Sequence, residues 1–511
     1  MVSLGFKPTA RLVFALLIAA LAIPAAAAER PNFLILMADN WSWPHAGAYG
    51  DPVVKTPAFD RVAEGGVLFR NGFAAAPGCA PSRAGLLTGR HIWTLEEGGT
   101  HASFFPRKLA VYPELLQKAG YFTGLTGKGA GPCNFKGAGW PHNPAGPSFD
   151  LVKETPAREG MSAHDYAANF GKFLEQRPKD TPFCFWYGCQ EPHRTYKKGI
   201  GAASGKRIDR IVVPPYLPDT LELRNDIADY LTEIEHFDAH LGRMLDALEK
   251  SGELENTIVI ATADNGMSFP GAKATMKDFG WHVPMAIMGK GRFRGGRTAE
   301  DVVSFTDLAP TILEAAGVRR PAEQNGRSLL GLLGSGRSGV MDRKFDAVYA
   351  GRERHSHARR DNLGYPTRAI RTREHLYIRN FAPERWMAGD PPSFRDIDDG
   401  PTKQWMMAHR EESAVKPLFD AAFGKMPGVE LYDVRKDPGC LRNLAGEAGQ
   451  AAVARRLGAR LEGELKRTKD PRVLGGGDVW ESYPRFSPMR PELGGFAAEG
   501  EYNPAFKAPA K

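Results

Sequence analysis

The chain has 511 residues, of which 42% are hydrophobic and 25% are charged, with 57 Gly and 39 Pro. This composition is that of a globular protein and argues against collagen-like, disordered and coiled-coil classes. The formal net charge of +8 suits an acidic substrate such as a sulfated or uronate-rich glycan, although ordinary surface charge explains it more simply. Lys and Arg are spread along the chain without a nucleic-acid-binding motif, so we expect no nucleic-acid partner.

Residues 1–28 have the pattern of a secretory signal peptide. Lys7 and Arg11 precede an apolar run at 12–23, which is followed by Pro24 and by small residues up to Ala28. The run is shorter than the roughly 20 residues that a membrane-spanning helix needs. We therefore expect cleavage after Ala28, a periplasmic or secreted chain, and no membrane attachment after cleavage.

Beyond this segment, short apolar runs alternate with amphipathic stretches. That alternation is typical of an α/β fold with a mostly parallel sheet between helices. The apolar runs predict buried strands, and helical spacing of apolar residues predicts helices; the strands are expected at 32–38, 121–127, 183–189 and 257–263, and the helices at 112–120 and 230–252.

From about residue 346 the pattern changes to that of a smaller α+β unit. Segments 369–381 and 429–444 resemble strands and turns, and a helix is expected around 450–467. The last forty or so residues are rich in Gly, Pro and aromatic residues. We therefore predict a large domain over 29–345, a smaller domain over 346–470, and an irregular tail over 471–511 that packs on the surface or is partly disordered.

Polar residues follow four of the predicted strands. They are Asp39 with Asn40, Lys128, Glu191 with His193, and Asp264 with Asn265. In open α/β sheets, ligands bind just beyond the carboxyl ends of the strands. One polar pair after a strand usually forms a turn. Four strand ends that together provide acidic, amide, basic and cationic side chains instead predict a ligand-binding or catalytic site.

The segment Cys79–Arg90, CAPSRAGLLTGR, is the most informative part of the chain. Pro81 suits the first turn of a helix, so Cys79 is expected at a helix N-terminus, where free N–H groups favour negative charge. The segment resembles the signature of the type I sulfatases, C-x-P-S-R followed by L-T-G-R. In that family the Cys becomes formylglycine, whose hydrated aldehyde is the nucleophile. The alternative is a reactive or structural Cys in a helix cap.

The resemblance extends over most of residues 31–445. Segments 31–41, 56–73, 262–276, 303–317 and 430–445 are similar to family landmarks, and EPHR (191–194) and VPPYLPDT (213–220) are similar to the sulfamidase-like, glycan-directed branch. The resemblance implies an alkaline-phosphatase-like fold. That fold has a large, mixed, mostly parallel sheet between helices and a smaller C-terminal α+β domain with an antiparallel sheet.

The resemblance also implies a cation site, with ligands Asp39, Asn40, Cys79, Asp264 and Asn265. Hard oxygen donors suit Ca²⁺ or Mg²⁺, and an exported protein favours Ca²⁺. The family usually has Asp where Asn40 stands. Asn keeps a carbonyl donor but removes one negative charge, which should weaken the hold on the cation. Simple turn caps are the alternative interpretation of both pairs.

By the same resemblance, the catalytic set is Cys79, Arg83, Lys128, His193 and Lys273. Fixed cations act where negative charge develops on the departing sulfate ester, and His193 is expected to act as an acid. The family usually has Lys-x-His after the strand, whereas here Gly129 and Ala130 follow Lys128. Another base must therefore serve, and His101 and His142 are candidates in flanking loops.

A further cluster opens the second domain, with Arg352, Arg354, His355, His357 and Asp361. We predict that Arg354, His355 and His357 bind substrate, while a solvated charged loop is the alternative.

The predicted function is hydrolysis of sulfate esters or N-sulfates of a glycosaminoglycan-like carbohydrate. The expected partners are that substrate and a formylglycine-generating or anaerobic sulfatase-maturing enzyme, and the expected cofactors are one Ca²⁺ and formylglycine from Cys79. Two alternatives stay open. One is a phosphoester or phosphonate hydrolase on the same scaffold, and the other is a non-catalytic exported glycan-binding protein, motivated by Asn40 and the missing histidine.

The chain has five cysteines, so at least one is outside any internal disulfide. The sequence leaves open whether Cys184 pairs with Cys189 and whether Cys133 pairs with Cys440.

Overall fold

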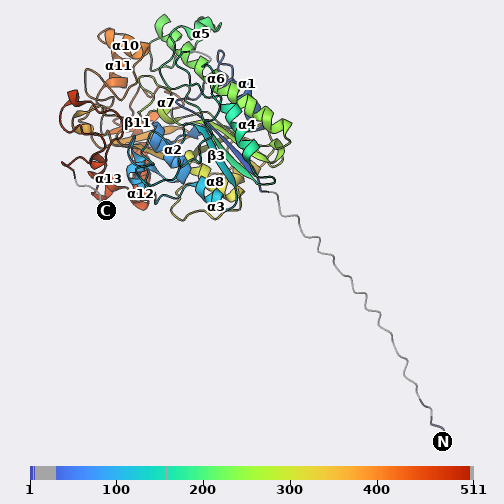
Figure 1. Cartoon of the computed structure of the whole chain (residues 1–511). Coiled ribbons are helices and arrows are strands. Elements are labelled where there is room, and N and C mark those ends of the chain that lie inside the picture. The colour runs from blue at the N-terminus through green and yellow to red at the C-terminus, as the bar shows by residue number, and fades with distance from the viewer. Residues whose placement is uncertain (4, 6–29, 157–158, 507–511) are drawn as a thin grey trace.

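The structure is a computed structural model that describes residues 1–3, 5, 30–156 and 159–506 (Figure 1). Apart from residues 1–3 and 5, the predicted signal peptide lies outside the described residues. Among the helices that are described, none combines the length and apolar character needed to cross a membrane. The strands form one sheet of seven and a second sheet of four.

The seven-stranded sheet has the order β3-β4-β1-β5-β6-β2-β7. Only β6 runs antiparallel to its neighbours, which confirms the predicted mixed, mostly parallel sheet. Every residue of β1 and β5 is buried, as expected for central strands covered on both faces. The strands are β1 (Asn32–Ala38), β2 (Gly66–Phe73), β3 (Phe122–Gly127), β4 (Phe183–Gly188), β5 (Thr257–Ala263), β6 (Met285–Gly289) and β7 (Arg297–Ser304). All four predicted strands are present, to within one residue at each end.

Helices cover both faces of this sheet (Figure 1). On one side lie α1 (Pro57–Gly65), α4 (Tyr166–Gln176) and α6 (Leu221–Lys250), and on the other lie α2 (Cys79–Thr88), α3 (Tyr112–Lys118) and α8 (Leu308–Ala315). Helix α6 begins nine residues before the predicted start at Tyr230, because the Thr220 side chain accepts a hydrogen bond from Leu223 N and caps a polar first turn. The short helices of this part are α5 (Ile200–Ala203), α7 (Asp278–Trp281) and α9 (Leu330–Gly334).

The second sheet is antiparallel throughout, with the order β11-β10-β9-β8. Its strands are β8 (Ala347–Arg352), β9 (Thr367–Thr372), β10 (His375–Asn380) and β11 (Val429–Asp433), and α10 (Pro401–Ala408) and α11 (Lys416–Phe423) lie between the last two in the chain. Helix α12 (Ala451–Arg467) buries Leu457, Leu461 and Leu465, which share one helix face. The predicted antiparallel sheet and following helix are confirmed.

The C-terminal segment contains the short helices α13 (Pro471–Leu474) and α14 (Val479–Ser482) and is otherwise largely irregular. This segment does more than pack on the surface, since the side chains of Trp480, Tyr483 and Arg485 are buried. Phe486 N donates to Ala102 O at 2.6 Å, so the segment packs against the loop that follows α2. The predicted domain boundaries near 345 and 470 stay predictions.

All five cysteines lie among the described residues, and all five are free thiols. Neither of the two pairings left open by the sequence is therefore present.

Candidate active site

The two acid–amide pairs lie side by side because β1 and β5 are parallel neighbours. Asp264 N donates to Ala38 O at 3.0 Å, and Asn40 N donates to the Asp264 carboxylate at 3.0 Å. Asn40 has a φ of 75°, in the left-handed region that Asn tolerates better than most residues. Asp39, Asn40, Asp264 and Asn265 are all buried, so four side chains with oxygen donors converge at the carboxyl edge of the sheet.

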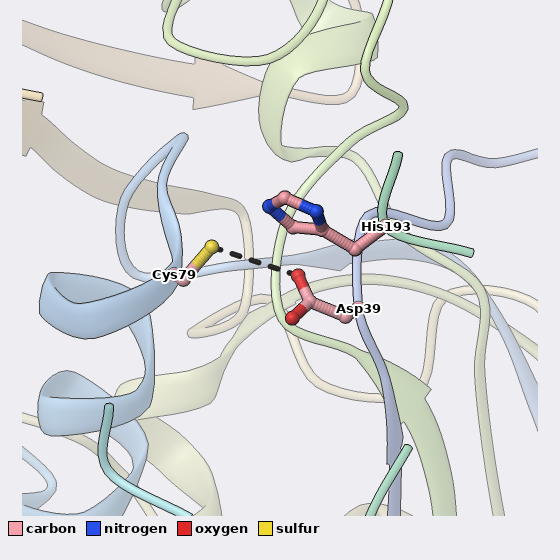
Figure 2. Close-up of side chains that lie close together, drawn as sticks. All are labelled: Asp39, Cys79 and His193. Carbon is pink, nitrogen blue, oxygen red and sulfur yellow. Dashed lines mark hydrogen bonds between the residues drawn. The ribbon is translucent and has the colours of Figure 1, made fainter. Parts of the chain in front are cut away.

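Cys79 is the first residue of α2, directly after the N-cap Gly78. Its Sγ lies 3.5 Å from Asp39 Oδ1 and 3.7 Å from Asn265 Nδ2. Figure 2 shows Cys79, Asp39 and His193 converging from three separate segments, and their potential ligand atoms all lie within 4.8 Å of one another. The structure thus brings the predicted nucleophile to the predicted cation site.

Three cationic side chains surround this group. Arg83 is fully buried and donates through Nε to Asp264 Oδ2 at 2.7 Å, while its Nη1 donates to Lys128 O at 2.7 Å. Lys128 Nζ forms an ion pair with Asp39. Lys273 Nζ lies 3.3 Å from His193 Nε2. All five predicted catalytic residues are therefore neighbours in space, although they come from four separate parts of the chain, with Cys79 and Arg83 both on α2.

Charge and burial set the protonation of the two central groups. Burial alone would raise the pKa of Asp39, but Lys128, His193 and Arg83 hold it below its ordinary value, so Asp39 is an anion. Burial raises the pKa of the Cys79 thiol to about 12, and the Asp39 charge adds to this effect. The unmodified residue is consequently a neutral thiol at pH 7, which is a poor nucleophile.

Asp398 is part of the site and has no signal in the sequence that would have revealed it. Its Oδ2 accepts a hydrogen bond from Lys273 Nζ at 2.9 Å, across 125 residues of chain. The positive charge of Lys273, followed by burial, lowers the pKa of His193. His193 is therefore neutral in the free site and gains affinity for a proton when an anion binds beside Lys273.

The surroundings of the Asn40 side chain indicate whether the four acid and amide residues could hold a cation. Its Oδ1 lies 3.0 Å from Asp39 Oδ1 and 3.1 Å from Asn265 Oδ1, and neither of these oxygens can donate a hydrogen bond. Such a cluster of acceptors is favourable around a hard cation. Without a cation, the opposite orientation of the Asn40 amide, with Oδ1 and Nδ2 exchanged, is favoured. In that orientation the amide nitrogen donates to Asp39 Oδ1 and Asn265 Oδ1, and the amide oxygen accepts from Lys273 Nζ. The donor set fits Ca²⁺ through Asp39, Asn40, Asp264 and Asn265.

The two candidate bases lie in different surroundings. The His101 ring packs 4.8 Å from the His355 ring, and burial, with the charges of His355, Arg485, Lys273 and Lys128, holds the pKa of His101 well below its ordinary value. The His142 ring is half-buried, with its Nδ1 2.9 Å from Asn143 O. Of the two, His101 is the one whose pKa is lowered by the charges of Lys128 and Lys273, two of the predicted catalytic residues.

The three predicted substrate-binding residues, Arg354, His355 and His357, lie in two different surroundings. Arg354 donates to the carbonyl oxygens of Tyr483 and Pro484, both at 2.8 Å, and His357 Nδ1 accepts from Arg490 N at 2.8 Å. Both residues thus hold the C-terminal segment. His355 instead lies against the start of α2, since a Cβ atom on Gly78 would lie 2.8 Å from its Nδ1. Substrate contact by the three residues stays a prediction, for which His355 is best placed.

Comparison with known proteins decides the family. The profile of the family described as Sulfatase matches residues 31–318, more than half of the chain. The chain belongs to the sulfatase family. This sulfatase is 28% identical over 506 residues to human N-sulphoglucosamine sulphohydrolase, covering 90% of this chain and 95% of that protein. It is 27% identical over 448 residues to an ulvan-active sulfatase of Formosa agariphila, covering 82% of this chain and 72% of that protein.

These relatives confirm the predicted sulfamidase-like, glycan-directed sulfatase family, whose members are sulfuric ester hydrolases. A solved structure in complex with its substrate D-glucosamine-2-N,6-O-disulfate has a TM-score of 0.62 and 22% identity, with 86% of this chain and 98% of that chain covered. A phosphonate monoester hydrolase of Agrobacterium radiobacter has a TM-score of 0.60 and 19% identity, with 87% and 97% covered. These likenesses show the fold, which is the predicted alkaline-phosphatase-like one.

Proposed function

We propose that the sulfatase hydrolyses O-sulfate or N-sulfate groups of a glycosaminoglycan-like carbohydrate, using formylglycine made from Cys79 and a bound Ca²⁺. The observation that carries this proposal is the contact of 3.5 Å between Cys79 Sγ and Asp39 Oδ1 at the start of α2, with Arg83, Lys128 and Lys273 around it. The names of the relatives, which include a sulphoglucosamine sulphohydrolase and a 2-O glycosaminoglycan sulfatase, support the substrate class.

The neutral thiol explains why modification is needed. A maturation enzyme would use an external oxidant such as dioxygen to remove two electrons from the Cys79 side chain, so that the sulfur leaves as sulfide and an aldehyde oxygen takes its place. When hydrated, this aldehyde supplies one hydroxyl that attacks sulfur and a second hydroxyl whose deprotonation releases sulfate. The protein must therefore provide a cation field for the sulfate, an acid for the leaving group and a base for the second hydroxyl.

The side chains of the site match these needs. Lys128 and Lys273 are placed to bind sulfate oxygens, and Arg83 fixes Asp264 in orientation. The bound Ca²⁺, held by Asp39, Asn40, Asp264 and Asn265, would neutralise charge on the sulfate. His193 gives its proton to the departing oxygen or nitrogen, so that the saccharide leaves neutral. His101 serves as the base in place of the histidine that Ala130 replaces.

The direct test is mass spectrometry of the Cys79 peptide from protein co-produced with a formylglycine-generating enzyme. We expect loss of the thiol mass, and sulfate release from sulfated saccharides measured by ion chromatography. Cys79→Ala should lower the rate at least about 10³-fold, since the nucleophile is lost. Cys440→Ala, which removes another buried thiol, is the matched control. Full activity of Cys79→Ala would overturn the proposal.

The fold neighbour that hydrolyses phosphonate monoesters keeps a second candidate open, a phosphoester or phosphonate hydrolase. Side-by-side assays with sulfated and phosphorylated forms of the same saccharide separate the two. Tight glycan binding without release of either group would instead favour a binding protein. We further propose export to the periplasm or beyond, supported by the signal-peptide pattern of residues 1–28. Amino-terminal sequencing of the mature protein tests this, with a start at Glu29 expected.

A further inference from the structure

Arg485 is a buried arginine beside the candidate site. It follows α14 and is 5% exposed. Its Nη1 lies 3.5 Å from His101 Nδ1 and donates to His355 O at 3.3 Å. Its Nε has no hydrogen-bond partner among the described residues, and within that part of the chain Arg485 forms no ion pair. A guanidinium has five N–H donors, so most of its donor capacity is unused.

Three other buried arginines of the same region are paired with carboxylates, whereas Arg354 has no ion pair among the described residues and donates to two carbonyl oxygens instead. Arg352 and Arg359 both pair with Asp396, and Arg368 pairs with Glu353 and Asp470. A buried charge without a counterion is strongly unfavourable unless something compensates it. The surroundings of Arg485 increase this cost, because burial, followed by the charges of Arg354 and Arg490, lowers its pKa to about 9. The charges of Asp396 and Glu499 act in the opposite direction, but neither forms an ion pair with Arg485, and Asp396 is already shared by Arg352 and Arg359. Arg485 is still a cation at pH 7 and has no paired carboxylate among the described residues.

The position of Arg485 relates it to the candidate nucleophile. His355 packs against Gly78, the residue before Cys79, and the His101 ring lies 4.8 Å from the His355 ring. Arg485 contacts both histidines. The guanidinium therefore contacts the His101 ring and the His355 backbone, and the His355 ring in turn lies against the start of α2. Neither histidine offers a negative charge, and no carboxylate among the described residues forms an ion pair with Arg485, so a bound anion could still pair with it.

We propose that Arg485, flanked by His101 and His355, binds a second anionic group of the substrate, a sulfate or a carboxylate near the sulfate that is cleaved. The planar guanidinium presents paired donors that match either group. This inference rests on the proposed function and refines it, because it restricts the preferred substrates to saccharides with at least two anionic groups. Arg485 is thus a specificity residue supplied by the C-terminal segment.

The test compares substrates that differ by one anionic group. Glucosamine with N- and 6-O-sulfates is compared with glucosamine that carries only the sulfate being cleaved, and an N-sulfated disaccharide is compared with and without its uronate carboxylate. For at least one of these pairs we expect kcat/KM of the wild type to be at least about tenfold higher with the extra anion, the effect of one charged hydrogen-bonded pair. Which pair responds identifies sulfate or carboxylate as the bound group.

Arg485→Gln should reduce that ratio to near one, and Arg485→Lys should restore part of it. Arg455→Gln removes an exposed arginine of α12 and should leave the ratio unchanged. Loss of the base would slow both members of a pair alike, so the ratio reports the second anion alone. A wild-type ratio near one for both pairs, or an undiminished ratio in Arg485→Gln, overturns the inference even if that variant is unstable. If no sulfated substrate is hydrolysed at all, the proposed function fails instead.

Discussion

Lys273 Nζ lies 2.9 Å from Asp398 Oδ2 and 3.3 Å from His193 Nε2, so one lysine joins the C-terminal part of the chain to the candidate catalytic acid. Lys273 follows β5, whereas Asp398 lies between β10 and α10. Burial would raise the pKa of Asp398, but Lys273 and His193 hold it below its ordinary value. Asp398 is therefore an anion whose charge fixes the lysine in place.

Replacement of Asp398 by Asn should lower kcat/KM for sulfated saccharides about 10- to 100-fold, because Lys273 loses the contact that positions it. Asp398 acts through Lys273, so the loss should be smaller in Asp398→Glu, which keeps the charge. Asp399→Asn is the matched control, since its carboxylate pairs with Arg395 and Lys403 instead. Equal activity of the Asp398→Asn and Asp399→Asn variants would refute a positioning role.

His193→Ala should slow the hydrolysis of saccharide sulfates about 10²- to 10⁴-fold, the usual contribution of a general acid. The loss should be much smaller for 4-nitrophenyl sulfate, because the nitrophenolate leaves without protonation. Steady-state rates on both substrates provide the comparison. An equal loss on the two would show that His193 does not protonate the leaving group.

Asn40→Asp should strengthen Ca²⁺ binding about tenfold or more, because the added carboxylate raises the ligand charge of the site. Calcium titration of chelator-treated protein gives the apparent Kd directly. Chelation should abolish sulfate release in the wild type, and added Ca²⁺ should restore it. Ser268→Ala, which removes only the hydroxyl beside the Asn40 amide, is the control. Unchanged calcium affinity in Asn40→Asp would place the cation elsewhere.

His101→Ala should separate the two halves of the reaction. Without the base, release of the leaving alcohol in the first turnover should stay fast, while sulfate release should fall about 10²-fold. Rapid-quench measurement of both products detects the resulting burst. His142→Ala is the matched control in the neighbouring loop. A burst in the His142 variant and not in the His101 variant would reverse the assignment.

Buried neutral histidines should make the fold sensitive to acid. Burial, followed by nearby cations, lowers the pKa of His240 from 6.5 to about 3. Between pH 6.5 and pH 3, His240 therefore binds a proton in the unfolded chain but stays neutral in the folded chain. The stability that the neutral histidine provides is present in full above pH 6.5 and is lost as the pH falls toward 3. Within that pH range, each such histidine lowers the free energy of unfolding by up to about 1.4 kcal/mol for each pH unit of acidification.

His355, with a pKa of about 3, belongs to the same class. The unfolding temperature should accordingly fall between pH 6.5 and pH 4, and His240→Gln should flatten this dependence. Thermal unfolding from pH 8 to pH 4 measures both effects. An identical pH dependence of the variant and the wild type would exclude His240 as a cause.

The nucleophile segment and the strand ends could be predicted from the sequence because both are local features. Strands β1 and β5 are continuous apolar runs, so their ends and the polar pairs that follow are visible in the chain itself. The helix that begins at Cys79 is signalled within twelve residues. Residues that sit at such ends are brought together by the parallel sheet, whatever the details of packing.

The contacts of Asp398, Arg354 and Arg485 could not be predicted in this way. Asp398 is one of several acids in an irregular segment, and its partner Lys273 is 125 residues away. Arg354 is predicted to bind substrate, but its guanidinium donates hydrogen bonds to two carbonyl oxygens of the C-terminal segment.

By itself, the sequence determined the main sheet and the family and predicted where the candidate site lies, because strand periodicity and a helix start are encoded by neighbouring residues. Only the tertiary structure decided which charges are paired and which, like Arg485, lack a partner. The physical reason is that charge pairing depends on distances between segments that no local pattern encodes.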